Sequence, residues 1–176
     1  MIADAAITTI AREGMRGFTH RAVDRLAELP EGSTSYYFRT REALMFAALA
    51  RMAELDSLDI GEPSSEGSLD ALAELLASVL QVWLTTGRDR TLARFELTLE
   101  STRRPELKAK MLEYGTMFRL MSESALRAAG ASEPERRGRT LVAHIDGLVL
   151  HELTRVGGGE SDLQAACRDV LAIALA

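Results

Sequence analysis

The chain has 176 residues, of which 47% are hydrophobic, so it can form one or two small domains with a substantial core. Its single cysteine, Cys167, excludes an intrachain disulfide and a cysteine metal cluster and favours a reducing cytoplasm. The net charge of −5 argues against a protein that coats nucleic acid with a diffuse positive surface. Between positions 16 and 41, however, five arginines outnumber three acids and give the segment a local excess of positive charge.

The N-terminus carries Asp4 and lacks basic residues ahead of an apolar run, so we do not expect a signal peptide. No apolar run reaches the roughly 18 residues that a membrane-spanning helix needs. We therefore expect a cytoplasmic protein that does not enter a membrane.

The N-terminal part of the chain shows three short helical patterns followed by a long one. The first pattern has an apolar face made by Ile2, Ala6, Ile7 and Ile10. The second covers residues 19–29, the third follows Gly32, and the fourth runs from about residue 40 to residue 56. This is the order of a helix-turn-helix unit, in which a supporting helix sets the angle at which a second helix enters the major groove of DNA.

Clusters of glycine, proline and serine divide the rest of the chain into further helices. Apolar residues at steps of three and four predict helices over 69–86, 106–129 and about 134–156, with another at the C-terminus. No alternating strand pattern occurs. The sequence therefore predicts an all-α fold with about nine helices.

The last two helices are expected to begin at capping boxes, formed by Ser132 with Glu135 and by Ser161 with Gln164. Both helices are apolar over most of their circumference, and one small core cannot bury so many apolar side chains. A second copy of the chain is expected to cover them, giving a homodimer with a four-helix interface. The residues predicted to form this interface are Val142, Ile145, Val149, Leu153, Leu163, Cys167, Val170 and Leu171.

The segment GSTSYYFRTREAL, residues 32–44, concentrates hydroxyls, tyrosines and arginines, and an ordinary surface turn with two packed tyrosines is its simplest alternative explanation. Together with an alanine-rich first helix that ends in AREG and a second helix that starts at Thr19, it resembles the TetR family of bacterial transcriptional regulators. The resemblance is specific for residues 2–46, and beyond them only helix number, helix order and the apolar terminal pair match. It implies a helix-turn-helix DNA-binding domain over 1–46 and a helical ligand-binding and dimerisation domain over 47–176.

The resemblance also implies which residues meet DNA. Thr19 would cap the second helix beside a phosphate, and one hydroxyl of the Tyr36–Tyr37 pair would bond a phosphate while the rings hold the short third helix in place. Arg41 stands at the family's phosphate-binding position in the first turn of the fourth helix. The full set of predicted DNA contacts is Thr19, His20, Arg21, Gly32, Ser33, Thr34, Ser35, Tyr36, Tyr37 and Arg41.

Four residues depart from the family pattern. Glu28 replaces the usual glycine of the turn, so it must adopt an unusual backbone conformation or change the turn. Pro30 replaces the usual serine cap. Asp24 and Glu31 are expected to place negative charge near the DNA surface, which would lower affinity or select against certain bases.

A stripe of aromatic and methionine residues in the second half of the chain has two interpretations. Core packing explains any single member, but methionine and aromatic side chains also adapt to varied apolar ligands. His144 would add a polar group to such a pocket or be a satisfied core residue. The candidate lining of an inducer pocket is Trp83, Phe95, Met111, Tyr114, Met117, Phe118, Met121 and His144.

No cofactor is expected. A metal site in particular is not expected, because His144 and His151 lie about 10 Å apart along one helix and cannot share an ion. The preferred hypothesis is a homodimeric, ligand-responsive regulator, specifically a repressor, that binds a palindromic operator and is released by a small apolar or amphipathic inducer. The alternative is a helical small-molecule-binding protein or enzyme without DNA binding. The enzyme hypothesis has little support, because the sequence holds no phosphate loop, nucleophile motif or HExxH.

Overall fold

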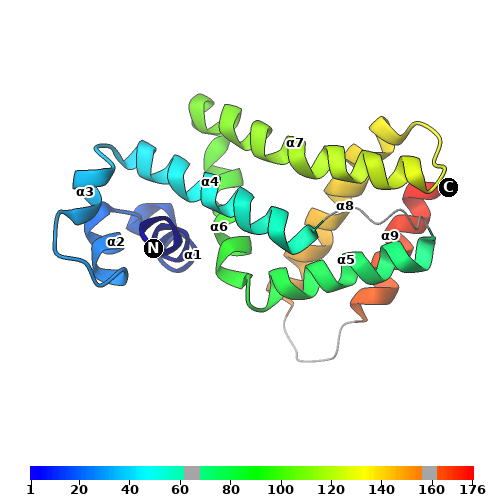
Figure 1. The fold of residues 1–176 in the computed structure, drawn as a ribbon, viewed down its shortest axis with the longest axis horizontal. Helices are drawn as coiled ribbons and strands as arrows, with labels where there is room; N and C mark the ends of the chain where they lie inside the picture. The colour runs from blue at the N-terminus through cyan, green and yellow to red at the C-terminus, as the bar shows by residue number, and fades with distance from the viewer. Residues whose placement is uncertain (62–67, 156–161) are drawn as a thin grey trace. The chain divides into compact units, whose positions relative to one another are not determined.

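The computed structural model describes residues 1–61, 68–155 and 162–176, and over these residues it contains nine α-helices and no strand (Figure 1). The predicted all-α fold is therefore confirmed. The helices are α1 (Ile2–Gly17), α2 (His20–Leu26), α3 (Ser33–Tyr37), α4 (Arg41–Ile60), α5 (Leu69–Leu84), α6 (Arg88–Ser101), α7 (Pro105–Ala128), α8 (Pro134–Thr154) and α9 (Leu163–Leu175). No single helix among them is both long and apolar enough to cross a bilayer, although α5 and α6, taken together as a bent pair, have the length and composition to do so.

Contacts divide the chain into two compact units. The head unit comprises residues 1–58 and 86–114, and the bundle unit comprises residues 59–85 and 115–176. Helix α6 therefore belongs to the same compact unit as α1, α2 and α3. The segment predicted to bind DNA, residues 1–46, is part of this larger unit.

In the head unit, α1 packs against α6 and α2. The buried residues of α1 recur at helical spacing and are Ala6, Ile7, Thr9 and Ile10. Phe18, which follows the helix, is fully buried. An ion pair between Arg12 on α1 and Asp89 on α6, with 3.2 Å between Nε and Oδ2, adds a polar link beside this apolar contact.

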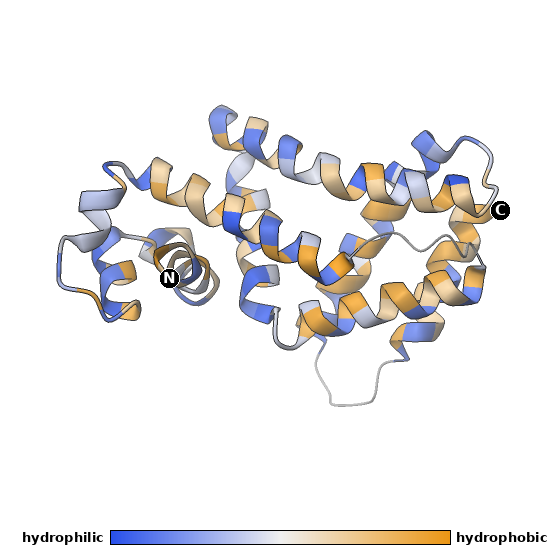
Figure 2. Cartoon of the chain, viewed as in Figure 1, coloured by the Kyte–Doolittle hydropathy of each residue, from blue (hydrophilic) through white to orange (hydrophobic). Residues whose placement is uncertain are grey.

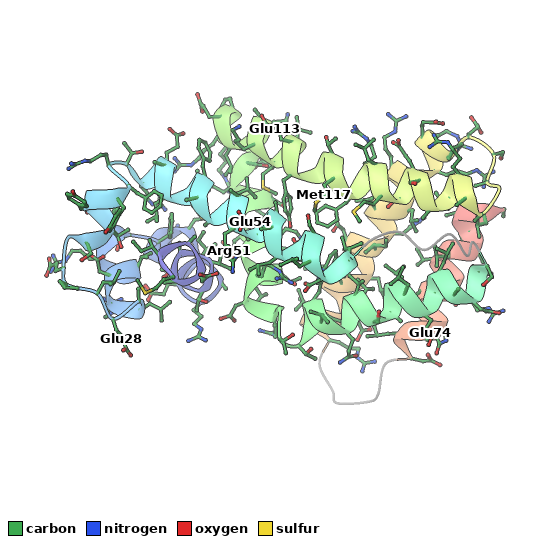
Figure 3. All side chains as sticks on the ribbon, in the orientation of Figure 1. Glu28, Arg51, Glu54, Glu74, Glu113 and Met117 are labelled. Carbon is green, nitrogen blue, oxygen red and sulfur yellow. The ribbon has the colours of Figure 1, made fainter. Side chains whose placement is uncertain are left out.

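The turn between α2 and α3 has two residues in the left-handed backbone region. Glu28 has a φ of 54°, so of the two outcomes expected at this position the structure shows the unusual backbone conformation, and Figure 3 shows the Glu28 side chain pointing away from α2. Gly32 has a φ of 94°, and a Cβ atom there would meet nothing within 4 Å. Glycine is therefore favoured at this position by its backbone conformation and not by a lack of space for a side chain. Thr19 caps α2 as predicted, because its hydroxyl accepts a hydrogen bond from the Ala22 N–H at 3.1 Å.

In the bundle unit, α5 packs against α9 and α8, and α8 packs against α9. Hydrophobic residues line α5 and α9 in Figure 2, whereas α3 in the head unit is mostly hydrophilic. The Trp83 and Phe118 rings meet edge to face, with 5.7 Å between their centroids. The buried apolar side chains of α5, α8 and α9 include Leu72, Leu80, Leu141, Val149 and Leu171.

The capping box predicted at Ser132 is wrong. Helix α8 is preceded instead by Glu133, which has a φ of 49°, and starts with Pro134, whose missing N–H costs nothing at this position. The Ser132 hydroxyl accepts a hydrogen bond from Arg137 at 3.0 Å. The box predicted at Ser161 lies outside the described residues, and the carboxylate of Asp162 caps α9.

Candidate nucleic-acid interface and ligand-binding residues

Helix α3 presents Ser35, Tyr36 and Tyr37 to solvent. Each tyrosine is 68% exposed, although aromatic residues are usually buried more deeply. The two rings meet edge to face with 5.2 Å between centroids, and the guanidinium of Arg39 lies 5.8 Å from the centre of the Tyr36 ring. Two phenols and a cation thus lie together on an exposed surface, and the same helix exposes the hydroxyl of Ser35, a combination suited to phosphates and base edges.

Thr34, which was predicted to contact DNA with its neighbours, is fully buried. Its N–H donates to Oδ1 of Asp24 at 2.7 Å, its hydroxyl donates to the same oxygen, and the Gly32 N–H donates to Oδ2 at 2.8 Å. The Thr34 side chain therefore has no surface with which to meet DNA. Asp24, which was expected to place negative charge near the DNA surface, is only 3% exposed, so its carboxylate is not part of the exposed surface of α3.

The buried carboxylate of Asp24 is stabilised in its charged form. Burial by itself raises the pKa of Asp24, but the hydrogen bonds from Thr34 and Gly32, with the nearby charge of His20, outweigh burial and bring the pKa below its ordinary value of 3.8. Asp24 is therefore ionised at neutral pH. Each of its hydrogen-bond donors is a neutral group, so the negative charge is held by dipoles and not by a salt bridge.

His20 and Arg21 begin α2 beside the capping residue. A ring nitrogen of His20 lies 2.7 Å from the carbonyl oxygen of Phe38, which connects the start of α2 to the end of α3. Arg21 is exposed and pairs with Glu31, with 2.9 Å between Nε and Oε1. The acid at Glu31 is therefore exposed as predicted, with its charge partly balanced by Arg21.

Ser33 and Arg41 direct polar atoms toward the backbone. The Ser33 hydroxyl donates to the carbonyl of Pro30 at 2.7 Å. Arg41 donates from Nε to the carbonyl of Phe18 at 2.7 Å and from Nη2 to the carbonyl of Met15, at the C-terminal end of α1. Arg41 thus connects the start of α4 to the C-terminal end of α1. The resemblance to the family, which implied a phosphate contact for Arg41, did not predict this structural role.

The residues predicted to line an inducer pocket fall in both compact units. Those in the head unit are Phe95, Met111 and Tyr114. Those in the bundle unit are Trp83, Met117, Phe118, Met121 and His144. Trp83 and Tyr114 are buried, His144 is exposed on α8, and the others, including Met117 labelled in Figure 3, are half-buried.

A buried polar cluster in the head unit was not predicted from the sequence. Asp56 on α4 pairs with Arg90 on α6, with 2.7 Å between Oδ1 and Nε, and its other oxygen accepts a hydrogen bond from the hydroxyl of Tyr114 on α7. Burial, followed by the charge of Asp56, raises the pKa of Tyr114 well above its ordinary value of 10.0, so the phenol stays protonated. Arg94, on the same helix as Arg90, is also buried.

The predicted dimer residues differ in burial. Val149, Cys167 and Leu171 are buried within the chain itself, and burial raises the pKa of the Cys167 thiol to about 11. The half-buried members of the set are Val142, Ile145, Leu153, Leu163 and Val170. Leu150 and Ile173, on the same two helices, are exposed and were not predicted.

Comparisons with known proteins agree on one family. Residues 67–176 match the family described as Tetracyclin repressor-like, C-terminal domain. A member of the TetR family from Streptomyces coelicolor A3 is 30% identical over 99% of this chain and 96% of its own, with a TM-score of 0.75. The multidrug binding protein EbrR, complexed with ethidium, is 33% identical over 99% of this chain and 96% of its own, with a TM-score of 0.73.

EbrR has also been solved in complexes with proflavin and with malachite green. A transcriptional regulator from Rhodococcus sp. Rha1 shares the fold, with a TM-score of 0.81 at 20% identity over 99% of this chain and 94% of its own. A search of curated proteins found no match.

Proposed function

Since the chain belongs to the TetR family of transcriptional regulators, we propose that it is a homodimeric, ligand-responsive repressor that binds a palindromic operator in the major groove of DNA. The observation that carries this proposal is the exposed surface of α3, where Ser35, Tyr36 and Tyr37 point into solvent from a helix fixed by buried contacts. Thr19, His20, Arg21, Gly32 and Ser33 would supply phosphate contacts around it. Thr34 is left out of the proposed DNA contacts because it is buried.

The proposed dimer forms through the outer faces of α8 and α9. Leu150 and Ile173 leave apolar surface exposed there, beside the half-buried members of the predicted interface. A twofold axis would place two copies of α3 about 34 Å apart, which matches successive major grooves on one side of DNA. The protein would then act in the cytoplasm, on the nucleoid when bound to its operator.

The proposed inducer is a multi-ring aromatic compound of the kind seen in EbrR, namely ethidium, proflavin or malachite green. Aromatic and methionine side chains suit such ligands because they offer flat and polarisable contact surfaces. In the bundle unit the edge-to-face pair of Trp83 and Phe118 is the proposed contact, with Met117 and Met121 beside it on α7.

The head unit offers a physical route by which ligand binding could change DNA binding. Two successive residues of α6 connect different helices, because Asp89 pairs with Arg12 on α1 and Arg90 pairs with Asp56 on α4. A displacement of α6 would therefore act on both helices that carry the helix-turn-helix segment. A coupling of about 1–3 kcal/mol is enough for a useful switch.

The test of DNA binding starts with duplexes selected by the wild-type protein from a random library, together with the DNA that flanks its own gene. We expect a specific, salt-sensitive complex whose affinity falls at least about tenfold in Tyr36→Ala. Leu99→Ala is the matched control, because Leu99 is similarly exposed but lies on α6. Failure of the wild-type protein to select any sequence would refute the proposed function.

The test of ligand binding uses fluorescence of Trp83, the only tryptophan of the chain. Proflavin is expected to quench it saturably in the absence of DNA, and less strongly in Phe118→Ala. Release of DNA is then measured with malachite green on wild type and variant side by side, so that direct dye–DNA binding cancels. An unchanged spectrum with all three dyes would reject this class of inducer while leaving DNA binding standing.

A further inference from the structure

We infer that Asp24 is a positioning residue for DNA recognition, and that the buried carboxylate of α2 sets the orientation in which α3 meets the major groove. This inference rests on the proposed DNA-binding function. It assigns Asp24 a role opposite to the one its charge suggests, since an acid at the DNA surface would weaken binding.

The evidence is the set of bonds between the two helices. Helix α3 has only five residues, and its N-cap, Gly32, has no side chain with which to cap it. A helix this short is not stable alone, so its orientation depends on contacts from outside. Asp24 supplies them through three donors, namely the N–H of Gly32, the N–H of Thr34 and the hydroxyl of Thr34.

These bonds fix both the position and the rotation of α3. Thr34 is fully buried, and its N–H and hydroxyl both donate to Asp24, so this side of α3 faces α2. Successive helical residues project about 100° apart, so Ser35 and Tyr36 leave this buried side, and Tyr37, at the end of the short helix, is exposed as well. A rotation of α3 that broke the contact between Thr34 and Asp24 would move all three side chains relative to the DNA.

Asn at position 24 cannot reproduce the arrangement. An amide has one oxygen, which could serve the two donors of Thr34, and an NH2 group, which would then face the N–H of Gly32. Two donors would meet at that position, so the start of α3 must shift. Asp24→Asn therefore changes the geometry of α3 while leaving the size of the side chain nearly unchanged.

The experiment compares Asp24→Asn with Glu31→Gln on a duplex selected by the wild-type protein and on a scrambled duplex of equal length. Both variants remove one negative charge from the α2–α3 region, but Glu31 is exposed and paired with Arg21. We expect Asp24→Asn to bind the selected duplex about tenfold more weakly, with less than about a twofold change on the scrambled duplex. Glu31→Gln is expected to bind both duplexes as tightly as wild type or more tightly.

Two results would overturn the inference. Equal or tighter binding of the selected duplex by Asp24→Asn would show that the bonds to Asp24 do not set the orientation of α3 that DNA binding needs. An equal loss on both duplexes, accompanied by loss of helical circular dichroism, would show a general folding role. A wild-type protein that selects no duplex would instead remove the proposed function on which the inference rests.

Thr34 provides a second variant in case Asp24→Asn does not fold. Thr34→Val keeps the shape of the side chain and the backbone N–H but removes the hydroxyl donor, so a smaller loss confined to the selected duplex is expected. Thr34→Ser keeps the donor and should restore binding. Identical affinities of the Val and Ser variants on the selected duplex would contradict the proposed role of this contact.

Discussion

Two buried aspartates of the head unit, Asp24 and Asp56, illustrate how the same side chain can serve different purposes. Both are 3% exposed. Asp24 accepts hydrogen bonds from neutral groups at most ten residues away, in the turn and helix that follow it. Asp56 joins α4 to α6 and α7 through a guanidinium and a phenol that lie far along the chain. The first arrangement orients a local element, and the second ties three helices together.

The comparison predicts its largest effect at Asp56. Asp56→Asn would leave the buried charge of Arg90 without this counter-charge, so the free energy of unfolding should fall by about 3–5 kcal/mol. Urea denaturation followed by circular dichroism measures the loss. Asp4→Asn is the matched control, because Asp4 pairs with Arg51 at 2.8 Å but is substantially exposed, and it should cost about 1 kcal/mol or less.

A triple variant separates the ion pair from the packing around it. Asp56→Leu, Arg90→Met and Tyr114→Phe together remove the carboxylate, the guanidinium and the phenol hydroxyl and leave no buried charge at these three positions, so most of the lost stability should return. If DNA binding persists in this variant while the response to the dye disappears, the cluster transmits the signal. A loss at Asp56→Asn as small as that at Asp4→Asn would contradict the contrast drawn between the two aspartates.

The stabilising contribution of Asp24 should depend on pH. Because the pKa of Asp24 is lowered in the folded protein, its hydrogen bonds stabilise the fold above the ordinary value of 3.8, and this contribution is lost as the pH falls through 3.8 and below the folded-state pKa. At neutral pH, the free energy of unfolding of Asp24→Asn should be about 1–3 kcal/mol lower than that of wild type. The difference should shrink steadily on acidification, as measured by urea midpoints at several pH values. A difference that stays constant to about pH 3 would show that ionisation of Asp24 contributes nothing.

The two aspartates also show what can and cannot be predicted from the sequence. Helical spacing predicted the helices, and the resemblance to the TetR family predicted the Thr19 cap and either an unusual backbone or a changed turn at Glu28. The burial of Asp24 had a weak local signal, because it directly follows Ala22 and Val23, which are buried on the same short helix.

No comparable signal marks the cluster at Asp56. A charged residue on a helix normally indicates a solvated face, and only the tertiary arrangement brings Asp56, Arg90 and Tyr114 together. The same limit applies to Arg41, whose acceptors are backbone carbonyls of α1 that no side-chain pattern encodes. Which residues of α7 contact a ligand and which only pack in the core likewise depends on the tertiary arrangement and cannot be read from the spacing.

The smallest predicted effect concerns the turn beside Asp24, and it separates the turn's own backbone strain from the contribution of the carboxylate. Glu28→Gly removes the side chain from a residue with left-handed backbone, which relieves about 1–2 kcal/mol of strain in the folded protein. The greater freedom of glycine in the unfolded chain offsets part of this gain, so the free energy of unfolding should rise by about 0.5 kcal/mol. Glu133 has nearly the same φ in the bundle unit, but its carboxylate pairs with Arg136 at 2.7 Å, so Glu133→Gly should gain less. Glu42→Gly, inside α4, should instead cost about 1 kcal/mol. If Glu28→Gly were as destabilising as Glu42→Gly in urea denaturation, the turn would not be strained at Glu28.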